Sequence, residues 1–186
     1  GLDAERIAVV VGHQKEAVKE RFNTDSSLDL IWVDQNKRLG TGHAARLALE
    51  ELATENSVII LYGDVPLVGI DSLKACIDEA DSGHLAVLVG EVSEPAGLGR
   101  ILRDSRGSVS GIIEEKDASP EQRDIHEINT GIIAAPGAFL EELILQIDNE
   151  NSQGEFYLTD VVTEAYQRGI PVVDVTAENE FEIKGI

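Results

Sequence analysis

The chain has 186 residues, of which 42% are hydrophobic and 27% charged, which is ordinary for one well-buried globular domain. It carries 35 acidic and 15 basic residues, a formal net charge of −20. This field repels nucleic-acid phosphates and anionic membrane surfaces, so neither a nucleic acid nor a membrane is expected as a partner. It also repels nucleotide phosphates, so a phosphate site must be built locally from backbone N–H groups, a cation or a few basic side chains.

The first residue, the absence of Met and the single cysteine predict the origin and the redox environment of the chain. It begins with Gly1 and contains no Met, which predicts a fragment or processed product of a longer protein. One cysteine excludes an internal disulfide and predicts a reducing, cytoplasmic environment. Cys76 lies at helical spacing from Leu73 and Ala80, which favours a buried structural thiol over a reactive one.

Strands and helices alternate in the first half of the chain. Short apolar runs predict buried strands at residues 7–11, 28–33, 58–62 and 85–89. Helical spacing predicts helices at residues 14–22, from residue 41 onward and at 71–80. Thr41 is a candidate cap for the second of these helices.

The second half adds less regular elements. Residues 100–103 and 109–114 flank a turn and predict a hairpin, and residues 125–135 look extended. Helices are predicted at 138–147 and 158–168, and a last strand at 171–175. No repeat or linker divides the chain, so residues 1–186 are predicted to form one domain. Its class is α/β, with a mainly parallel sheet and added antiparallel strands.

Ligands of open α/β sheets lie beyond the carboxyl ends of the strands, which directs attention to three places. These are Gly12-His13, the segment after Val33, and Gly63-Asp64. The second contains LGTGHA at residues 39–44, where glycines let the backbone approach a ligand before a helix begins. A tight turn with a capping Thr explains this string equally well.

The third place is YGDVP at residues 62–66, where Asp64 follows a buried strand. A lone carboxylate there suits Mg²⁺, which takes its other ligands from water and substrate phosphates. The alternative is that Asp64 serves only as a turn or cap residue.

Further polar segments in the second half could contact sugar hydroxyls, although each taken alone fits a turn or a solvated face. The histidines have no zinc-site spacing, and neither a nucleophile elbow nor a Walker-type loop is present. Covalent catalysis therefore has no clear candidate. The pattern favours chemistry by positioning and charge neutralisation, as in nucleotidyl transfer.

Six strings in register resemble the uridylyltransferase domain of bacterial N-acetylglucosamine-1-phosphate uridylyltransferases. They are LGTGHA, YGDVP, GRI, EKDA, EINTG and EFYLTD, and the resemblance extends from about residue 7 to residue 186. It implies a Rossmann-like nucleotide-diphospho-sugar transferase fold. It also implies formation of UDP-N-acetylglucosamine and pyrophosphate from UTP and N-acetylglucosamine-1-phosphate with Mg²⁺. That product is a precursor for peptidoglycan and cell-wall synthesis.

The resemblance also implies roles for individual residues. Gln35 would hydrogen-bond the uracil, with Gly40 and Thr41 completing the base pocket. The ribose and phosphates would lie along Tyr62, Gly63 and Asp64, with Asp64 binding Mg²⁺ as the catalytic metal ligand. The N-acetylglucosamine group would be held by Gly99, Glu114 and Asn129. Tyr157 and Thr159 would lie nearby and complete the set of substrate-binding residues.

The chain departs from the family pattern in three places. The family's Gly-rich phosphate loop and the first, central strand that carries it would precede Gly1, and a second metal ligand would follow Ile186. The domain is therefore expected to be incomplete at both ends. Residues 1–186 alone are expected to be inactive and poorly stable, with a gap or a direct pairing between strands 7–11 and 58–62. Leu98 stands where the family usually has Tyr.

Two other functions stay open beside the uridylyltransferase. One is a pyrophosphorylase for another nucleotide or sugar, and the other is a non-catalytic module that binds sugar nucleotides. The presence of the acetyltransferase domain found in bifunctional members, and homo-oligomerisation of the parent protein, are left open.

Overall fold

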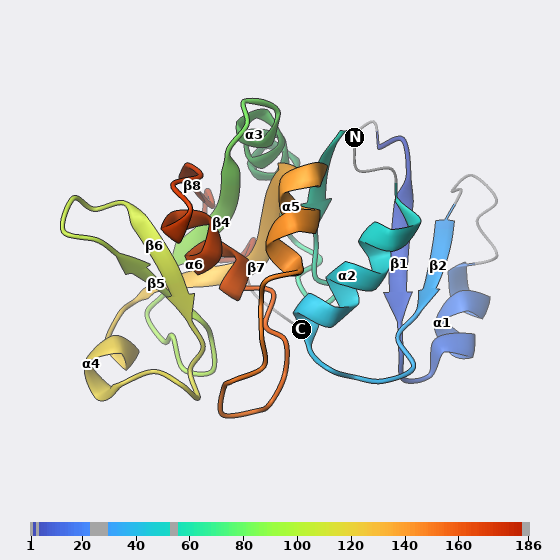
Figure 1. Cartoon of the computed structure of the whole chain (residues 1–186), viewed down its shortest axis with the longest axis horizontal. Coiled ribbons are helices and arrows are strands. Elements are labelled where there is room, and N and C mark those ends of the chain that lie inside the picture. The colour runs from blue at the N-terminus through green and yellow to red at the C-terminus, as the bar shows by residue number, and fades with distance from the viewer. Residues whose placement is uncertain (1, 3, 23–29, 53–55, 184–186) are drawn as a thin grey trace.

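The computed structural model describes residues 2, 4–22, 30–52 and 56–183. In this part of the chain a six-stranded sheet lies between helices, and a separate two-stranded sheet lies beside it (Figure 1). The strands are β1 (Ile7–Val11), β2 (Leu30–Asp34), β3 (Ser57–Ile60), β4 (Leu85–Glu91), β5 (Arg100–Arg103), β6 (Val109–Ile113), β7 (Glu127–Pro136) and β8 (Val172–Thr176). The helices are α1 (Lys15–Phe22), α2 (Thr41–Glu51), α3 (Ile70–Asp81), α4 (Pro120–Arg123), α5 (Gly137–Ile144) and α6 (Asp160–Gln167).

The ten-residue strand β7 organises the large sheet, whose order is β6-β5-β7-β4-β8 with β3 also on β7. Its C-terminal half pairs with β3, from Ile133 opposite Ile60 to Pro136 opposite Ser57. Its N-terminal half meets β5 at Ile128. Since β4 pairs along the same strand from Glu127 to Ala134, β3 and β5 share the other edge of β7.

A break in β7 separates these two halves. Gly131 has a φ of 84°, and the register of β4 against β7 shifts between Val87 and Val89. The Thr130 hydroxyl donates to the Leu88 carbonyl at 2.8 Å, and the Asn129 side-chain oxygen accepts from the Gly131 N–H at 3.1 Å. The strand therefore bends at a position where one of the candidate sugar-binding residues lies.

Strand β4 is buried on both faces, as its continuous apolar sequence predicts. Leu85, Val87 and Val89 face a core formed with α2, α5 and α6, including Leu49, Leu140, Leu143 and Val161. Ala86 and Leu88 face a second core formed with α3. Cys76 of α3 is fully buried in that second core, as predicted, and burial raises the pKa of its thiol to about 11.

Strands β1 and β2 form the parallel two-stranded sheet, from Ile7 opposite Leu30 to Val11 opposite Asp34. Helix α2 contacts β1, and the Gln35 N–H continues the ladder to the Val11 carbonyl at 2.8 Å. Among the described residues, β1 and β3 belong to different sheets and do not pair with each other. The sequence predicted either a gap or a direct pairing between these two strands. The structure shows no direct pairing between them among the described residues.

The predicted α/β class is confirmed, and several boundaries differ. Strand β3 ends at Ile60, so Leu61 and Tyr62 lie beyond it. Two strand pairs are parallel and four antiparallel among the described strands, so the antiparallel share is larger than predicted. Residues 28 and 29 of the second predicted strand lie outside the described residues.

The short helix α4 was not expected. Ser119 caps it through a capping box with Gln122, and Pro120 occupies its first turn. The Ser-x-x-Gln string was a usable signal for this helix start.

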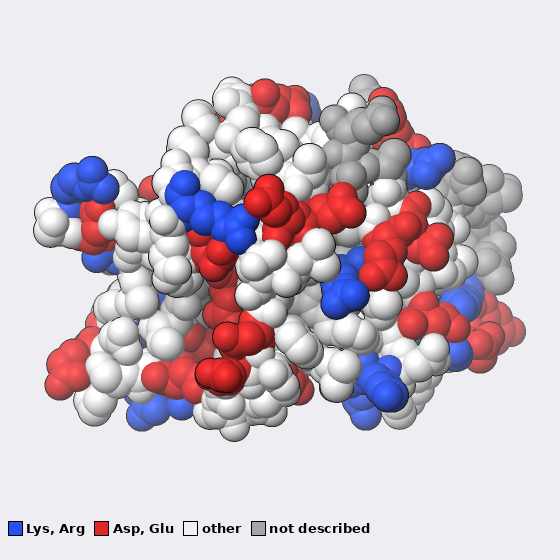
Figure 2. Space-filling view, in the orientation of Figure 1, with Lys and Arg blue, Asp and Glu red and all other residues white. Residues whose placement is uncertain are grey.

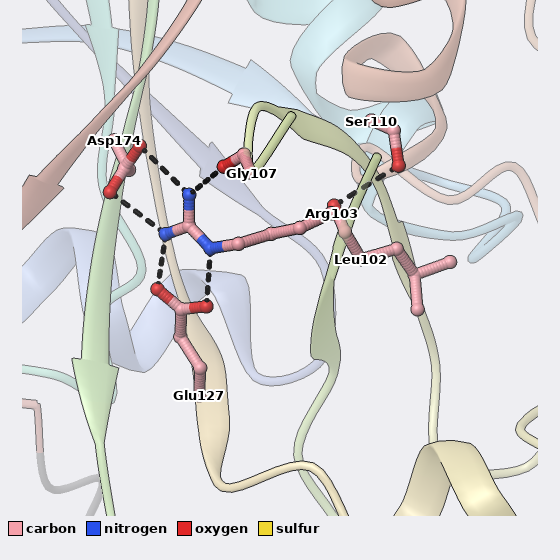
Figure 3. Close-up of polar contacts among 6 residues, drawn as sticks. All are labelled: Leu102, Arg103, Gly107, Ser110, Glu127 and Asp174. Carbon is pink, nitrogen blue, oxygen red and sulfur yellow. Dashed lines mark hydrogen bonds and ion pairs between the residues drawn. The ribbon is translucent and has the colours of Figure 1, made fainter. Parts of the chain in front are cut away.

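A surface ion-pair cluster ties the β5–β6 hairpin to the rest of the sheet (Figure 3). Arg103 of β5 donates to Glu127 of β7, through Nε at 2.8 Å and through a second nitrogen, and to Asp174 of β8 at 2.9 Å. It also donates to the Gly107 carbonyl in the hairpin turn at 2.8 Å. These bonds raise the pKa of Arg103 and lower that of Asp174.

No helix within the described residues has both the length and the apolar character required of a membrane span.

Candidate active site

The LGTG turn before α2 packs tightly against the segment that precedes α6. The Gly42 N–H donates to the Phe156 carbonyl at 2.8 Å, and the Phe156 N–H donates to the Leu39 carbonyl at 2.8 Å. Gly40 has a φ of 108°, and a Cβ added there would lie 2.4 Å from the Phe156 oxygen. The protein's own backbone therefore already requires glycine at residue 40.

Thr41 is the first residue of α2 and makes no side-chain cap of that helix, so the predicted capping role is wrong. Its hydroxyl instead accepts the Leu158 N–H at 3.0 Å. Thr41 thus joins two of the sequence strings that the resemblance placed in one site, LGTGHA and EFYLTD.

Gln35 lines a cavity of about 180 Å³ at the carboxyl ends of β1 and β2. The other lining residues are Gly12, His13, Lys15, Asn36 and Arg38. The Gln35 amide nitrogen donates to the Gly40 carbonyl at 3.0 Å and lies 3.0 Å from Nδ1 of His43. The cavity occupies the position that the strand-end rule predicts for a ligand.

One lining residue of this cavity, Lys15, belongs to a group of paired charges. Asp34 accepts from Lys15 at 2.7 Å and from Lys19 at 2.8 Å. These hydrogen bonds lower the pKa of Asp34, and the same contact raises the pKa of Lys15. Two basic side chains, Lys15 and Arg38, therefore line the cavity with Gln35 in an otherwise acidic protein.

Tyr62 lies between the LGTG turn and β7. A Cβ at Gly131 would lie 2.6 Å from the Tyr62 ring, so the positive φ and the missing side chain of Gly131 make room for that ring. Burial raises the pKa of Tyr62, while a hydrogen bond with the Thr41 side chain lowers it and the charges of Glu114 and Asp64 raise it further. The contact of Gly131 with Tyr62 was not anticipated from the sequence, although an isolated glycine within a strand is a known sign of close approach.

Gly63 and Asp64 are exposed in the turn between β3 and α3. The turn is closed by the Val65 N–H, which donates to the Tyr62 carbonyl at 3.3 Å. Within the described part of the chain, no hydrogen bond or ion pair engages the Asp64 carboxylate. Asp64 lines neither of the two cavities described in this subsection, and its place in the substrate crevice stays a prediction.

The structure brings the proposed sugar-contact residues together. The Asn129 N–H donates to the Gly99 carbonyl at 2.9 Å, and the Thr159 hydroxyl donates to Glu114 Oε1 at 2.8 Å. A Cβ at Gly99 would lie 3.5 Å from both Glu114 carboxylate oxygens. These residues therefore form one cluster: Gly99 directly precedes β5, Glu114 directly follows β6, Asn129 lies in β7 and Thr159 directly precedes α6.

A second cavity, of about 330 Å³, lies beside this cluster, between β6 and the α5–α6 connection, and Glu114, Tyr157 and Asp160 are among its lining residues. The Tyr157 hydroxyl accepts from Gln153 at 2.8 Å and donates to Asp117 at 3.3 Å, and burial raises its pKa. Burial first, then the charges of Asp148, Glu114 and Asp117, raise the pKa of Asp160 to about 6. Asp160 stood within the EFYLTD string, but the sequence alone gave no sign of its environment.

Acidic side chains run down the middle of the viewed face, over β6 and the α5–α6 connection (Figure 2). The carboxylates that line the larger cavity are Glu114, Asp117, Asp148, Glu150, Asp160 and Glu164. No group of three or more His, Cys, Asp or Glu side chains in the described ranges could hold a metal ion. A cation at Asp64 would take its other ligands from water and substrate phosphates, and one free carboxylate fits that mode of Mg²⁺ binding.

A strand-end cavity, a glycine turn and a polar cluster on an α/β scaffold form a ligand-binding architecture of the nucleotide-binding α/β class. The sequence model of the Nucleotidyl transferase family matches residues 2–181, and the chain belongs to this family.

Three relatives described as "Bifunctional protein GlmU" are similar to this chain. The protein of Neisseria gonorrhoeae is 46% identical over 171 residues, which cover 92% of this chain and 36% of that protein. Those of Nitrosococcus oceani and Pseudomonas paraeruginosa are 45% and 44% identical over 185 residues, covering 100% of this chain and 40% of each relative. The chain thus spans well under half the length of these relatives.

The fold has a solved counterpart. A crystal structure of UDP-glucose pyrophosphorylase complexed with UDP-glucose superposes with a TM-score of 0.74 at 15% identity. The match covers 97% of this chain and 76% of that one. At this identity the likeness establishes the fold alone, and it confirms the fold expected from the sequence.

Proposed function

We propose that this chain forms part of a uridylyltransferase that makes UDP-N-acetylglucosamine and pyrophosphate from UTP and N-acetylglucosamine-1-phosphate. In this reaction an oxygen of the sugar 1-phosphate attacks the α-phosphorus of UTP. The bond between the α-phosphorus and the bridging oxygen breaks, and pyrophosphate leaves with that oxygen.

One observation carries the proposal. Two hydrogen-bonded pairs, Gly99 with Asn129 and Glu114 with Thr159, lie side by side although they come from four separate segments. This cluster is found in a chain 44–46% identical to bifunctional GlmU proteins. Carboxylate, amide and hydroxyl groups of this kind can hydrogen-bond sugar hydroxyls and an acetamido group.

The nucleotide would lie on the opposite side of Tyr62 from the proposed sugar-contact residues. Gln35 would present its side-chain amide to the uracil from the smaller cavity, beside the turn formed by Gly40 and Thr41. Lys15 and Arg38 line this cavity and would offset the repulsion between the acidic chain and the nucleotide phosphates. Tyr62 and Gly63 would lie along the ribose and phosphates.

Asp64 would hold Mg²⁺. When bound there, the cation would neutralise charge on the phosphates during the transfer. The exposed Asp64 carboxylate has no competing ion pair among the described residues, so it is available to such a ligand. A role in supplying cell-wall precursors and a cytoplasmic location belong to the same proposal.

A substrate panel on the full-length protein tests it. UTP, CTP, ATP, GTP and dTTP are each combined with N-acetylglucosamine-1-phosphate or glucose-1-phosphate and Mg²⁺, and pyrophosphate and nucleotide sugar are measured. UDP-N-acetylglucosamine should be the preferred product. Preference for another pair would favour a different pyrophosphorylase, and binding without turnover would favour a non-catalytic sugar-nucleotide module.

A further inference from the structure

Arg100, the first residue of β5, is a buried cation that the proposed function has not yet used. Only 1% of its side chain is exposed, in a protein whose net charge is −20. A buried guanidinium is costly unless it is paired and hydrogen-bonded. The hydrogen bonds of the Arg100 guanidinium therefore indicate which segments of the chain this side chain holds together.

The backbone places Arg100 at the centre of the proposed sugar cluster. It pairs with Ile113 of β6 on one side and with Ile128 of β7 on the other. Gly99 directly precedes it, Glu114 follows Ile113, and Asn129 follows Ile128. All three residues are therefore one step from Arg100 or from its pairing partners.

The side chain joins the segments that carry two of these residues. One terminal nitrogen donates to the Leu98 carbonyl, beside Gly99. The other donates to Glu115 Oε2 at 2.6 Å, beside Glu114, and to the Arg123 carbonyl at the end of α4 at 3.2 Å. The Arg123 side chain closes the arrangement by donating to the Glu115 carbonyl at 3.3 Å.

We propose that Arg100 is a positioning residue that sets the affinity for the sugar phosphate by holding Gly99 and Glu114 at their present separation. This inference rests on the proposed function. The planar guanidinium reaches three acceptors in two directions, which the single ammonium group of Lys cannot do. Glu115 supplies the compensating charge, with about a third of its side chain in solvent.

Arg103 provides a matched control on the same strand. It also binds carboxylates and a backbone carbonyl, those of Glu127, Asp174 and Gly107 (Figure 3). Its contacts hold the hairpin to β7 and β8 and include none of the proposed substrate residues. Arg103→Lys therefore reproduces the chemistry of Arg100→Lys without touching the sugar cluster.

The experiment compares wild type, Arg100→Lys, Arg103→Lys and Glu115→Gln in the full-length protein. Steady-state kinetics give kcat and the KM values for UTP and N-acetylglucosamine-1-phosphate. Calorimetry gives the sugar-phosphate affinity, and thermal unfolding gives Tm. Arg100→Lys should raise the KM and the dissociation constant for the sugar phosphate by about tenfold or more, the effect of losing one hydrogen bond to a charged group such as Glu114. The KM for UTP should change by less than about threefold.

The other variants separate positioning from general destabilisation. Arg103→Lys should lower Tm while leaving both KM values near wild type. Glu115→Gln, which keeps Arg100 and alters only a partly exposed side chain, should give a smaller shift in the same direction as Arg100→Lys. It also tests the inference if Arg100→Lys does not fold.

Equal changes in both KM values for Arg100→Lys, or unchanged sugar-phosphate affinity in Arg100→Lys or Glu115→Gln, would overturn the inference while leaving the proposed function intact. A wild type that forms no UDP-N-acetylglucosamine would overturn the proposed function, and the inference with it.

Discussion

Asp160 is a carboxylate whose ionised form is disfavoured by burial and by neighbouring negative charges. It lines the larger cavity with Glu114, Asp117 and Asp148, and its pKa rises from 3.8 to about 6. Because the folded-state pKa is raised, ionisation of Asp160 disfavours the folded state. That penalty is absent below about pH 3.8, grows up to about pH 6 and is constant above it.

Asp160→Asn should therefore stabilise the protein at pH 7–8. The expected gain is about 1 kcal/mol, after allowing for solvent screening of a partly exposed group. The difference in Tm between variant and wild type, measured from pH 4 to pH 8, should grow through pH 4–6 and then level off. A difference independent of pH would contradict this account of Asp160.

Gln35 gives a second residue-scale prediction. Its amide can offer both a donor and an acceptor to uracil, whereas a carboxylate only accepts. In the present structure Gln35→Glu would also lose the bond to the Gly40 carbonyl. Binding of UTP should weaken by about tenfold or more, with a smaller effect on the sugar phosphate.

Calorimetry on Gln35→Glu and on Asn36→Asp makes the comparison. Asn36 lines the same cavity, so its variant introduces the same charge one residue away. Equal losses in the two variants would indicate repulsion by charge alone. Equal losses for both substrates in Gln35→Glu would indicate a folding defect.

The site residues show what the sequence could and could not predict. LGTGHA and EFYLTD are two segments that the structure brings into contact, but their packing against each other could not be inferred from either string. Gly40 is required by the Phe156 carbonyl and Thr41 binds the Leu158 N–H. Both contacts join residues more than a hundred positions apart, and local turn chemistry carries no information about such pairs.

At the element scale, helix α3 is stabilised by a residue from the far end of the chain. Gly69 is its N-cap and provides no side chain. Glu182, only 7% exposed, accepts from the Gly69 N–H at 3.2 Å and from the Ser72 hydroxyl at 2.8 Å. The Asn179 amide donates to the other carboxylate oxygen of Glu182 at 3.1 Å. Both oxygens of this buried carboxylate therefore accept hydrogen bonds.

Glu182→Ala should lower the free energy of unfolding by about 1–3 kcal/mol, because it leaves a helix end and a buried hydroxyl without an acceptor. Glu182→Gln, with one acceptor oxygen left, should lose less. Urea unfolding gives both values, and Glu180→Ala at a neighbouring exposed position serves as the control. A loss from Glu182→Ala no larger than that of the control would contradict the capping role.

The elements themselves were mostly predictable because hydrophobic runs and helical spacing are local properties. Strand β4 and helix α3 follow their patterns closely. Pairing was less predictable: β7 accepts β3, β4 and β5 as antiparallel partners, and β3 and β5 share one edge on either side of Gly131. The pattern of a buried strand does not distinguish parallel from antiparallel neighbours.

At the scale of the whole molecule, the two sheets are the main feature. Strand β1 pairs only with β2, and β3 only with β7, within the described residues. An edge whose backbone N–H and C=O groups lack partners costs about 1–3 kcal/mol for each buried group. A few such groups approach the typical net stability of about 5–15 kcal/mol.

Residues 1–186 expressed alone should therefore be poorly stable and should not convert UTP and N-acetylglucosamine-1-phosphate to product. Thermal unfolding monitored by circular dichroism and a pyrophosphate-release assay on the same sample test this expectation. A cooperative transition together with product formation would contradict it.

The central claim is that this fold holds a Mg²⁺-dependent uridylyltransferase site at Asp64. The most direct measurement is UDP-N-acetylglucosamine formation by the full-length protein, comparing wild type with Asp64→Asn over a range of Mg²⁺ concentrations. Asp71→Asn, at an exposed position in the first turn of α3, is the matched control. We expect wild type and Asp71→Asn to form product, and Asp64→Asn to lose most turnover, about 100-fold or more, with its Tm unchanged. Near-normal turnover of Asp64→Asn at saturating Mg²⁺ would contradict the claim.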